Sequence, residues 1–406
     1  MGEKISPIIR DPWRVVDYAS KRGEYKDDNG GLEILTHLPL IDCGLGDSNE
    51  PPPQVLKDIL IQTLETGTLI EAFWKYPPDR FCEQPSRLIE ERFGLDSSGN
   101  HEIIFDGPGS YGILAKIIWQ LPDLTTQEEI GVLGIGPQFA NIASFVEAHG
   151  KKQNGYLNFP YLPIQPSLDL PYYEKIRLLI DQRKQMNGHR FIYIDNPNNP
   201  TGDFSSLESI RELVEIANQH KDVVIIDEAY GDVVDDNQSA IHLVDQYPNL
   251  IVLRGIAKSL GMAGARVGYA IMSKELGELY KSLQLVFGVG GPQQLVLNEV
   301  LKPEIIKPHL QQIREKTVLL KRQLINGLTQ LGVRVFPTHE AVPILLAQGP
   351  VDNFFQRLRR WQIVTERGSD FIKTYPLDDS YVRIKVPGSE EEIIEVLNRV
   401  KQALIE

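Results

Sequence analysis

The feature that most constrains the fold of this chain is a regular alternation of short apolar runs with helical segments from about residue 100 onwards. The runs are rich in β-branched residues and do not alternate apolar with polar positions, as a strand with one solvated face would. Amphipathic segments such as SYGILAKIIWQL and SLESIRELVEIANQH separate the runs. The pattern predicts a mostly parallel sheet sandwiched by helices. The predicted strands are EIIF (102–105), IGVLGI (130–135), FIYI (191–194), VVII (223–226) and IVL (251–253).

Beyond residue 305 this alternation stops. A long helical stretch, about 306–331, is followed by short segments in irregular order, which is typical of a smaller α+β domain. The last helix is expected to open with Ser389, and Glu392 follows it at capping-box spacing. The first 55 residues do not follow the sheet pattern, and we expect them to fold onto the small domain. The predicted division is 1–55 for the N-terminal segment, 56–305 for the large domain and 306–406 for the small C-terminal α+β domain.

Composition excludes several classes of protein. The net charge of −13 argues against a nucleic-acid surface and against an anionic membrane as partner. Only Cys43 and Cys82 are present, which are too few for a disulfide framework and lack metal-ligand spacing, so we expect no metal site. The segment MGEKISPIIRDPWR holds no apolar run of the kind found in signal peptides, and the longest apolar stretches are too short to cross a bilayer. We expect a cytoplasmic protein.

In parallel sheets, ligands bind at the carboxyl ends of the strands, so the residues that follow each run matter most. EIIF is followed by GPGSYG, in which Gly107, Gly109 and Gly112 let a ligand approach the backbone. The helix that begins near Ser110 offers unpaired N–H groups, and together these features make a phosphate cradle. A plain glycine-rich turn explains the motif equally well when it is considered alone.

Three further runs lead into polar or aromatic residues. FIYI precedes NPNNPTG (196–202), whose two Asn-Pro pairs make a rigid turn that can hold an amide in place. VVII precedes Asp227, which either caps a following helix or is a partly buried anion that needs a cation. Tyr230 follows three residues later, which we expect to be one helical turn. IGVLGI precedes Phe139, which either belongs to the core or stacks on a flat ligand.

The run IVL leads into a loop of small residues that carries Lys258 and, eight residues later, Arg266. A surface lysine is the ordinary interpretation. The alternative is a lysine that bonds covalently to a cofactor, with an arginine for the phosphate of that cofactor. Phosphate-binding backbone, an amide, a carboxylate, a phenol, a lysine and an arginine would then meet at the strand ends of one sheet. That convergence favours a functional site.

The motifs GPGSYG, NPNNPTG, DEAY and AKSLGMAGARVGY, in this order and at these separations, resemble the pyridoxal-phosphate-dependent aminotransferases of fold type I. The nearer branch is the class I/II group, which includes aspartate and histidinol-phosphate aminotransferases. The resemblance runs from about residue 40 to the C-terminus. It implies a sheet of the seven-stranded type, pyridoxal 5′-phosphate as cofactor, an amino-acid and keto-acid substrate pair, and a homodimer with active sites at the interface.

The resemblance also implies a role for individual residues. Lys258 would hold the cofactor as an internal Schiff base and move the substrate proton, and Asp227 would keep the pyridine nitrogen protonated. Tyr230 and Asn199 would bind the ring oxygen of the cofactor, and Arg383, with Asn199 beside it, would bind the α-carboxylate of the substrate. Arg383 alone would otherwise be an exposed strand arginine. For the cofactor phosphate the implied residues are Gly109, Ser110, Tyr111 and Arg266, with Tyr76 from the neighbouring subunit, while Phe139 would stack on the pyridine ring.

Two positions depart from the family pattern. Gly255 stands three residues before the lysine, where the family usually has a hydroxyl, and Tyr111 stands where a small hydroxyl residue is common. The resemblance implies transamination of an L-amino acid to a keto acid and pyridoxamine phosphate. The two departures leave an alternative open, which is elimination and cyclisation, or decarboxylation, of an amino acid. A non-catalytic scaffold is disfavoured, because it needs no electron sink. The amino acid itself stays open: Asp47 or Asn49 either contacts its side chain or belongs to a turn.

Overall fold

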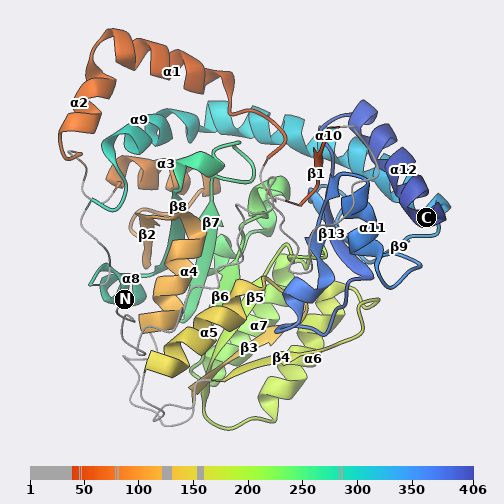
Figure 1. Cartoon of the computed structure of the whole chain (residues 1–406). Coiled ribbons are helices and arrows are strands. Elements are labelled where there is room, and N and C mark those ends of the chain that lie inside the picture. The colour runs from red at the N-terminus through yellow and green to blue at the C-terminus, as the bar shows by residue number, and fades with distance from the viewer. Residues whose placement is uncertain are drawn as a thin grey trace, which may run out of the picture.

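The structure is a computed structural model that describes residues 39–44, 46, 48–77, 79, 82–120, 130–152, 160–282, 284 and 287–406. Its centre is a seven-stranded sheet with the order β2-β8-β7-β6-β5-β3-β4 (Figure 1). Strands β4, β3, β5, β6 and β7 are parallel to one another, and β8 runs antiparallel to both β7 and β2. The predicted mostly parallel sheet is confirmed. The strands are β2 (His101–Asp106), β3 (Ile130–Ile135), β4 (Tyr161–Ile164), β5 (His189–Asp195), β6 (Val223–Asp227), β7 (Leu250–Gly255) and β8 (Gly268–Ser273).

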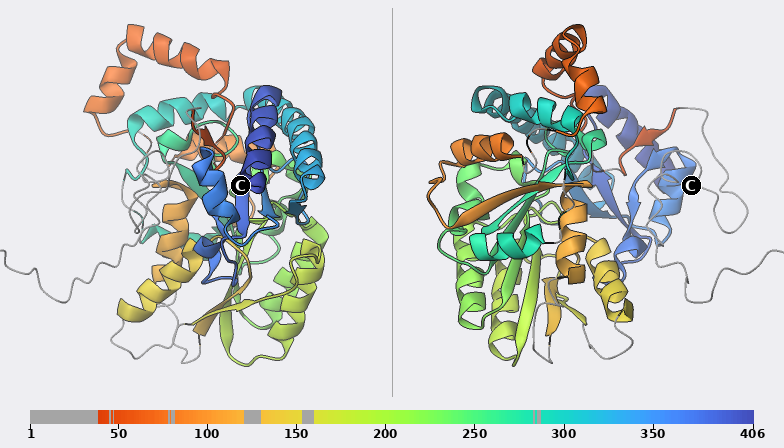
Figure 2. Two further views of the ribbon diagram at one scale, coloured as in Figure 1. Left: turned by 45° about the vertical axis from the view of Figure 1, so that its right-hand side comes forward. Right: turned by 90° about the vertical axis from the view of Figure 1, so that its left-hand side faces the viewer.

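The central strands are apolar on both faces because helices cover both (Figure 2). In β6, Ile225 packs into one core cluster, while its neighbours Val224 and Ile226 pack into the other. This is the two-residue period of a strand with two buried faces. Helices α4 (Gly109–Gln120) and α5 (Asn141–Lys152) cover the Ile225 face, and α6 (Tyr172–Lys184) and α7 (Leu207–Gln219) cover the opposite face. All five predicted strand runs are strands; β4 and β8 are additional.

Three further helices and an arm lie along the β2 edge of the molecule. Helix α3 (Glu83–Phe93) packs against α9 (Gly291–Val300), and α8 (Lys274–Lys281) packs against β2 and β8. Helices α1 (Gln54–Glu65) and α2 (Thr68–Trp74) contact α9 and project away from the body (Figure 1). The arm carries large apolar side chains that are more than half exposed in this chain: Leu64, Ile70, Phe73, Trp74 and, directly after it, Tyr76.

The C-terminal part forms a second, antiparallel sheet with the order β12-β13-β10-β9. Ser389 caps the last helix by accepting a hydrogen bond from the backbone N–H of Glu392, as its spacing predicts. Glu392 in turn accepts from the N–H of Gly388, one residue before the cap. The elements are α10 (Pro303–Gln330), β9 (Arg334–Val335), β10 (Ile344–Gln348), α11 (Phe354–Arg360), β12 (Glu366–Arg367), β13 (Tyr381–Lys385) and α12 (Glu390–Ile405).

The described end of the N-terminal segment lies beside this second sheet. Strand β1 (Ile41–Asp42) pairs in parallel with β11 (Ile363–Val364), and the N–H of Lys385 donates to the carbonyl of Cys43. Residues 1–38 of the predicted segment lie outside the described residues. The division of the chain at residues 55 and 305 stays a prediction. Within the described part of the chain, no helix has both the length and the apolarity that a membrane span requires.

A buried lysine on α10 holds the loop between β9 and β10. The side chain of Lys321 is 0% exposed, and its Nζ donates to four oxygens at 2.6 to 2.8 Å. We expect Lys321→Met to lower the free energy of unfolding by roughly 3 kcal/mol, because it leaves buried carbonyl oxygens without a donor. Urea denaturation measures this loss. The same change at the exposed Lys307 of α10 should leave the midpoint nearly unchanged; equal effects at the two positions would contradict the interpretation.

Candidate functional site

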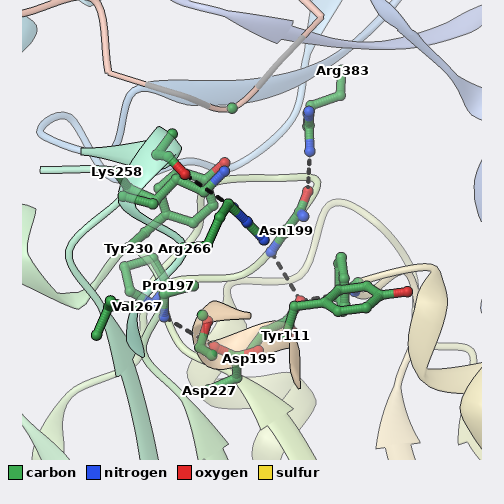
Figure 3. Close-up of a pocket in the computed structure, with 18 residues that line it drawn as sticks. Tyr111, Asp195, Pro197, Asn199, Asp227, Tyr230, Lys258, Arg266, Val267 and Arg383 are labelled. Atoms are coloured by element: carbon green, nitrogen blue, oxygen red, sulfur yellow. Dashed lines mark hydrogen bonds between the residues drawn. The ribbon is translucent and has the colours of Figure 1, made fainter. Parts of the chain in front are cut away.

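A cavity of about 420 Å³ opens where the carboxyl ends of β5, β6 and β7 face the second sheet (Figure 3). Its walls come from the GPGSYG turn, NPNNPTG, DEAY and the lysine loop, with one arginine from β13. The motifs that the sequence places at successive strand ends therefore share one cavity. The predicted site residues that line it are Gly109, Ser110, Tyr111, Phe139, Asn199, Asp227, Tyr230, Lys258, Arg266 and Arg383.

Asp227 ends β6 at the floor of the cavity. It accepts hydrogen bonds from the hydroxyl of Tyr193 at 3.0 Å and from the N–H of Ala229 at 3.0 Å. Burial raises the pKa of Asp227 to about 6. The residues that follow form a turn and the short 3₁₀ helix Gly231–Val233, so the expected helical turn between Asp227 and Tyr230 is wrong. Asp227 is accordingly a buried anion rather than a helix cap.

Asp195, at the end of β5, is a buried carboxylate that was not predicted as a site residue. Its oxygens accept from the N–H groups of Phe139 at 2.9 Å and Asn199 at 3.0 Å, and from the amide of Asn198 at 2.9 Å. Burial raises its pKa to about 7. Asp195 therefore fixes the backbone of two predicted cofactor-binding residues. The sequence carried the same signal here as at Asp227, a carboxylate directly after a buried strand.

Lys258 and Tyr230 lie together under the N-terminal segment. The Nζ of Lys258 is 5.5 Å from the centroid of the Tyr230 ring. A Cβ on Gly46 would come within 2.2 Å of the Tyr230 hydroxyl and 3.1 Å of the Lys258 Nζ. Only a glycine lets this backbone pass so closely, and sequence reasoning missed it. Of the two residues expected here, Asp47 lies outside the described residues, and the Asn49 amide donates to the carbonyl of Val386.

The opposite end of the cavity is suited to an anion. Helix α4 begins at Gly109, so its first N–H groups and the positive end of its dipole face the cavity. Arg266 lies beside this helix start, with Nη2 donating to the carbonyl of Pro108 at 3.1 Å. At Gly255, an added Cβ would contact only the hydroxyl of Ser110, at 3.7 Å. The space that a hydroxyl side chain at position 255 would occupy is therefore free of described atoms other than the Ser110 hydroxyl, which lies beside it.

Two predicted tyrosines differ in their surroundings. Tyr111 lines the cavity, but its hydroxyl accepts a hydrogen bond from the amide of Asn141 at 3.2 Å and its ring packs edge-on against Phe145. Tyr76 is 80% exposed, stacks on Phe287 at 4.7 Å and does not line the cavity of this chain. Its predicted contact with a neighbouring subunit stays a prediction, and so do the roles of the residues that do line the cavity.

The arrangement fits pyridoxal 5′-phosphate. Helix α4 and Arg266 supply an anion site at one end, the buried carboxylate of Asp227 suits a ring N–H⁺, and Lys258 offers an amine for an aldehyde. Phe139, whose backbone Asp195 holds, provides an aromatic face. Asn199 directs its amide oxygen at Arg383, at 2.8 Å, and so has its amide nitrogen to offer to a ligand oxygen.

Comparison with known proteins agrees with this reading. The profile of the family described as "Aminotransferase class I and II" matches residues 171–400. A histidinol-phosphate aminotransferase of Caldanaerobacter subterraneus is 34% identical over 299 residues, which cover 72% of this chain and 75% of that protein. Histidinol-phosphate aminotransferase 2 of Archaeoglobus fulgidus is 28% identical over 241 residues, 58% of this chain; the match spans 65% of that relative, slightly less than two thirds of its length.

Among solved structures, the histidinol-phosphate aminotransferase of Sinorhizobium meliloti in complex with pyridoxal-5′-phosphate superposes with a TM-score of 0.71. The sequence identity is 18%, and the match covers 90% of this chain and 91% of that one. At this identity the likeness concerns the fold.

We expect the affinity of the cofactor-free protein for pyridoxal phosphate to fall as the pH is lowered through about 6. The raised pKa of Asp227 means that its carboxylate becomes protonated in this range and no longer pairs with the ring N–H⁺. Fluorescence titration of the dissociation constant from pH 7.5 to pH 5 measures the effect. Asp227→Asn should bind more weakly and lose this part of the pH dependence; identical pH profiles for the two proteins would contradict the assignment.

We expect Gly255→Ser to tighten cofactor binding about 5-fold, because its hydroxyl enters open space at the anion end and one hydrogen bond contributes about 1 kcal/mol. The dissociation constant of pyridoxal phosphate is the measurement. Gly264→Ser, which adds a hydroxyl where nothing lies within 4 Å, is the neutral control. Weaker binding in Gly255→Ser than in the control would show that the phosphate lies elsewhere.

Proposed function

The chain belongs to the aminotransferases of class I and II, and from this premise we propose that it transfers the amino group of an L-amino acid to a 2-oxo acid with pyridoxal phosphate attached to Lys258. Members of the family depend on this cofactor. One observation carries the proposal. A lysine and an arginine from the loop after β7, a buried carboxylate at the end of β6 and an arginine from β13 line one cavity.

Each end of the cavity has a separate task in this reaction. Arg383 and Asn199 orient the α-carboxylate of the substrate from the side of the second sheet, and Arg266 with the start of α4 holds the phosphate. Lys258 lines the same cavity, so a substrate held at these two ends would have its amine beside Lys258. The bound cofactor supplies an electron sink for the charge that develops at the substrate Cα.

Lys258 is the proposed base, and its Nζ takes the proton from the substrate Cα. The Tyr230 ring on one side and the Gly46 backbone on the other confine this amine. Asp227, buried at the cavity floor, accepts hydrogen bonds from Tyr193 and the N–H of Ala229, which favour its charged form, and this charge would pair with the ring N–H⁺. Confinement and charge together favour proton transfer at one atom over exchange with water.

We expect the purified protein to absorb as a pyridoxal enzyme and to lose that absorbance in Lys258→Ala, which cannot form the covalent bond. With a panel of L-amino acids, the wild type should convert its cofactor to the pyridoxamine form and release a 2-oxo acid. Absorbance and coupled oxo-acid assays measure both. Release of ammonia or carbon dioxide without pyridoxamine would contradict transamination and favour the elimination or decarboxylation alternative.

We propose that the enzyme is a homodimer and that the α1–α2 arm lies in the interface. Phe73 and Trp74 are 73% and 81% exposed in the single chain, and large exposed apolar patches mark interaction sites. Tyr76, at the end of the arm, would then reach the phosphate end of the partner site.

We also propose a cytoplasmic location, because Cys43 and Cys82 are both free, buried thiols, as expected in a reducing compartment.

We expect Phe73→Asp with Trp74→Asp to shift the protein from dimer to monomer, because the two exposed aromatic side chains that the proposed interface would bury are lost. Analytical ultracentrifugation measures the mass. The matched control is Ile372→Asp with Ile394→Asp, two exposed apolar residues away from the arm, which should leave the mass unchanged. A wild type that sediments as a monomer at micromolar concentration would contradict the proposal.

A further inference from the structure

Arg383 is engaged by the protein itself. The residue is only 4% exposed, and its guanidinium donates to the Asn199 side-chain oxygen at 2.8 Å and to the Gly44 carbonyl at 2.6 Å. Its third partner carries a charge: Nη1 lies 2.5 Å from a carboxylate oxygen of Glu366. Figure 3 shows Arg383 reaching from the second sheet toward Asn199.

The Glu366 pair is built into the second sheet. Glu366 lies on β12 and is the direct cross-strand partner of Arg383 on β13. It is 3% exposed, so neither charge of the pair faces bulk water. A buried ion pair is weakly screened by salt, and removing one partner leaves the other charge uncompensated. The strand register therefore fixes a negative charge against the arginine that is expected to bind the substrate.

The charges around the cavity have a direct consequence for the substrate. Among the described residues that line it, the cations are Lys258, Arg266 and Arg383, and the anions are Asp195 and Asp227. Lys258 and Arg266 serve the cofactor, so Arg383 is the remaining cation, and Glu366 already offsets its charge. Glu366 does not itself line the cavity, but its charge beside Arg383 leaves this side of the site without net positive charge. A second anionic group on a substrate would therefore find no uncompensated cation among the described lining residues, and like charges at close range cost several kcal/mol.

We propose that Glu366 is a specificity-determining residue: it offsets Arg383 so that the site accepts amino donors with one carboxylate and an uncharged or cationic remainder, and selects against dicarboxylic and phosphorylated donors. The proposal rests on the proposed transamination and names its substrate class. In a site without such a carboxylate, the full positive charge of the arginine would be available to an anion of the substrate. Glu366 acts through Arg383 and through its own charge, without a bond to the reacting atoms.

The test uses the holoenzyme and pairs of donors that differ in charge and hardly in size. For L-glutamine against L-glutamate and L-asparagine against L-aspartate, kcat/KM should favour the amide at least 10-fold in the wild type. Glu366→Gln removes the charge and keeps an oxygen acceptor, and it should shift the ratio toward the acid by about 10-fold, mainly through KM. L-histidinol against its phosphate ester extends the comparison to a phosphorylated donor.

Two further variants separate charge from packing. Glu366→Asp keeps the charge and should retain the wild-type preference for the amide. Glu340→Gln removes a carboxylate whose side chain is 55% exposed and pairs with Arg322 at the surface, and it should change neither ratio. A merely structural role of Glu366 would lower stability in Glu366→Gln without moving the acid-to-amide ratio.

A wild type that uses the acids or the phosphate ester as well as their neutral partners would overturn the proposal, and so would an unchanged ratio in Glu366→Gln. If Glu366→Gln does not fold, the wild-type ratios decide alone. If no donor is transaminated, the proposed function fails, but absorbance titration of the bound cofactor with the same pairs still measures their relative affinities. A charge-independent affinity in that titration would overturn the role of Glu366 separately.

Discussion

The site depends on the parallel pairing of β5 with β6, which sets Asp195 and Asp227 side by side where both strands end. Both carboxylates are buried, and the loss of contact with water raises the pKa of each above its usual range. Their hydrogen bonds then separate their roles. Asp195 accepts from Phe139, Asn199, Asn198 and Tyr172 and so fixes the turns around the cavity. Asp227 accepts from Tyr193 and Ala229 and is the carboxylate suited to a ligand cation.

The cavity is closed by parts of the chain that are remote from this sheet. Gly44 and Gly46 bring the N-terminal segment over Arg383, Tyr230 and Lys258. The pairing of β1 with β11 holds that segment in place, and the hydrogen bond from the N–H of Lys385 to the carbonyl of Cys43 joins it to the second sheet. At Gly46 the backbone can lie against Tyr230 and Lys258 only because no Cβ intervenes. The second sheet therefore contributes both the arginine that we propose as the substrate-binding residue and a contact that supports the N-terminal segment over the site.

The two ends of the cavity differ in charge, because the arginine at one end is paired with a carboxylate. The buried pair of Glu366 and Arg383 adds no net charge, so the end of the cavity proposed for the substrate is close to neutral. The opposite end, proposed for the phosphate, keeps Arg266 and the start of α4. A family resemblance predicts the arginine but carries no information about the carboxylate on the neighbouring strand. Substrate preference within such a family then depends on residues that surround the shared set, since fold and cofactor are common to many reactions.

By itself, the sequence determined the five central strands, the long helix near 306–331, the Ser389 cap and the motif residues at the strand ends, because these follow from local periodicity and from residue types at short spacing. The family resemblance added the cofactor and the expected roles. Local spacing misled at Tyr230, which the chain reaches through a turn, and it did not reveal the bond that commits the Tyr111 hydroxyl to Asn141. Only the tertiary structure decided that Gly44 contacts Arg383 across 339 residues and that Glu366 opposes the same arginine. Strand register and chain closure set those contacts, and neither leaves a periodic signal in the sequence.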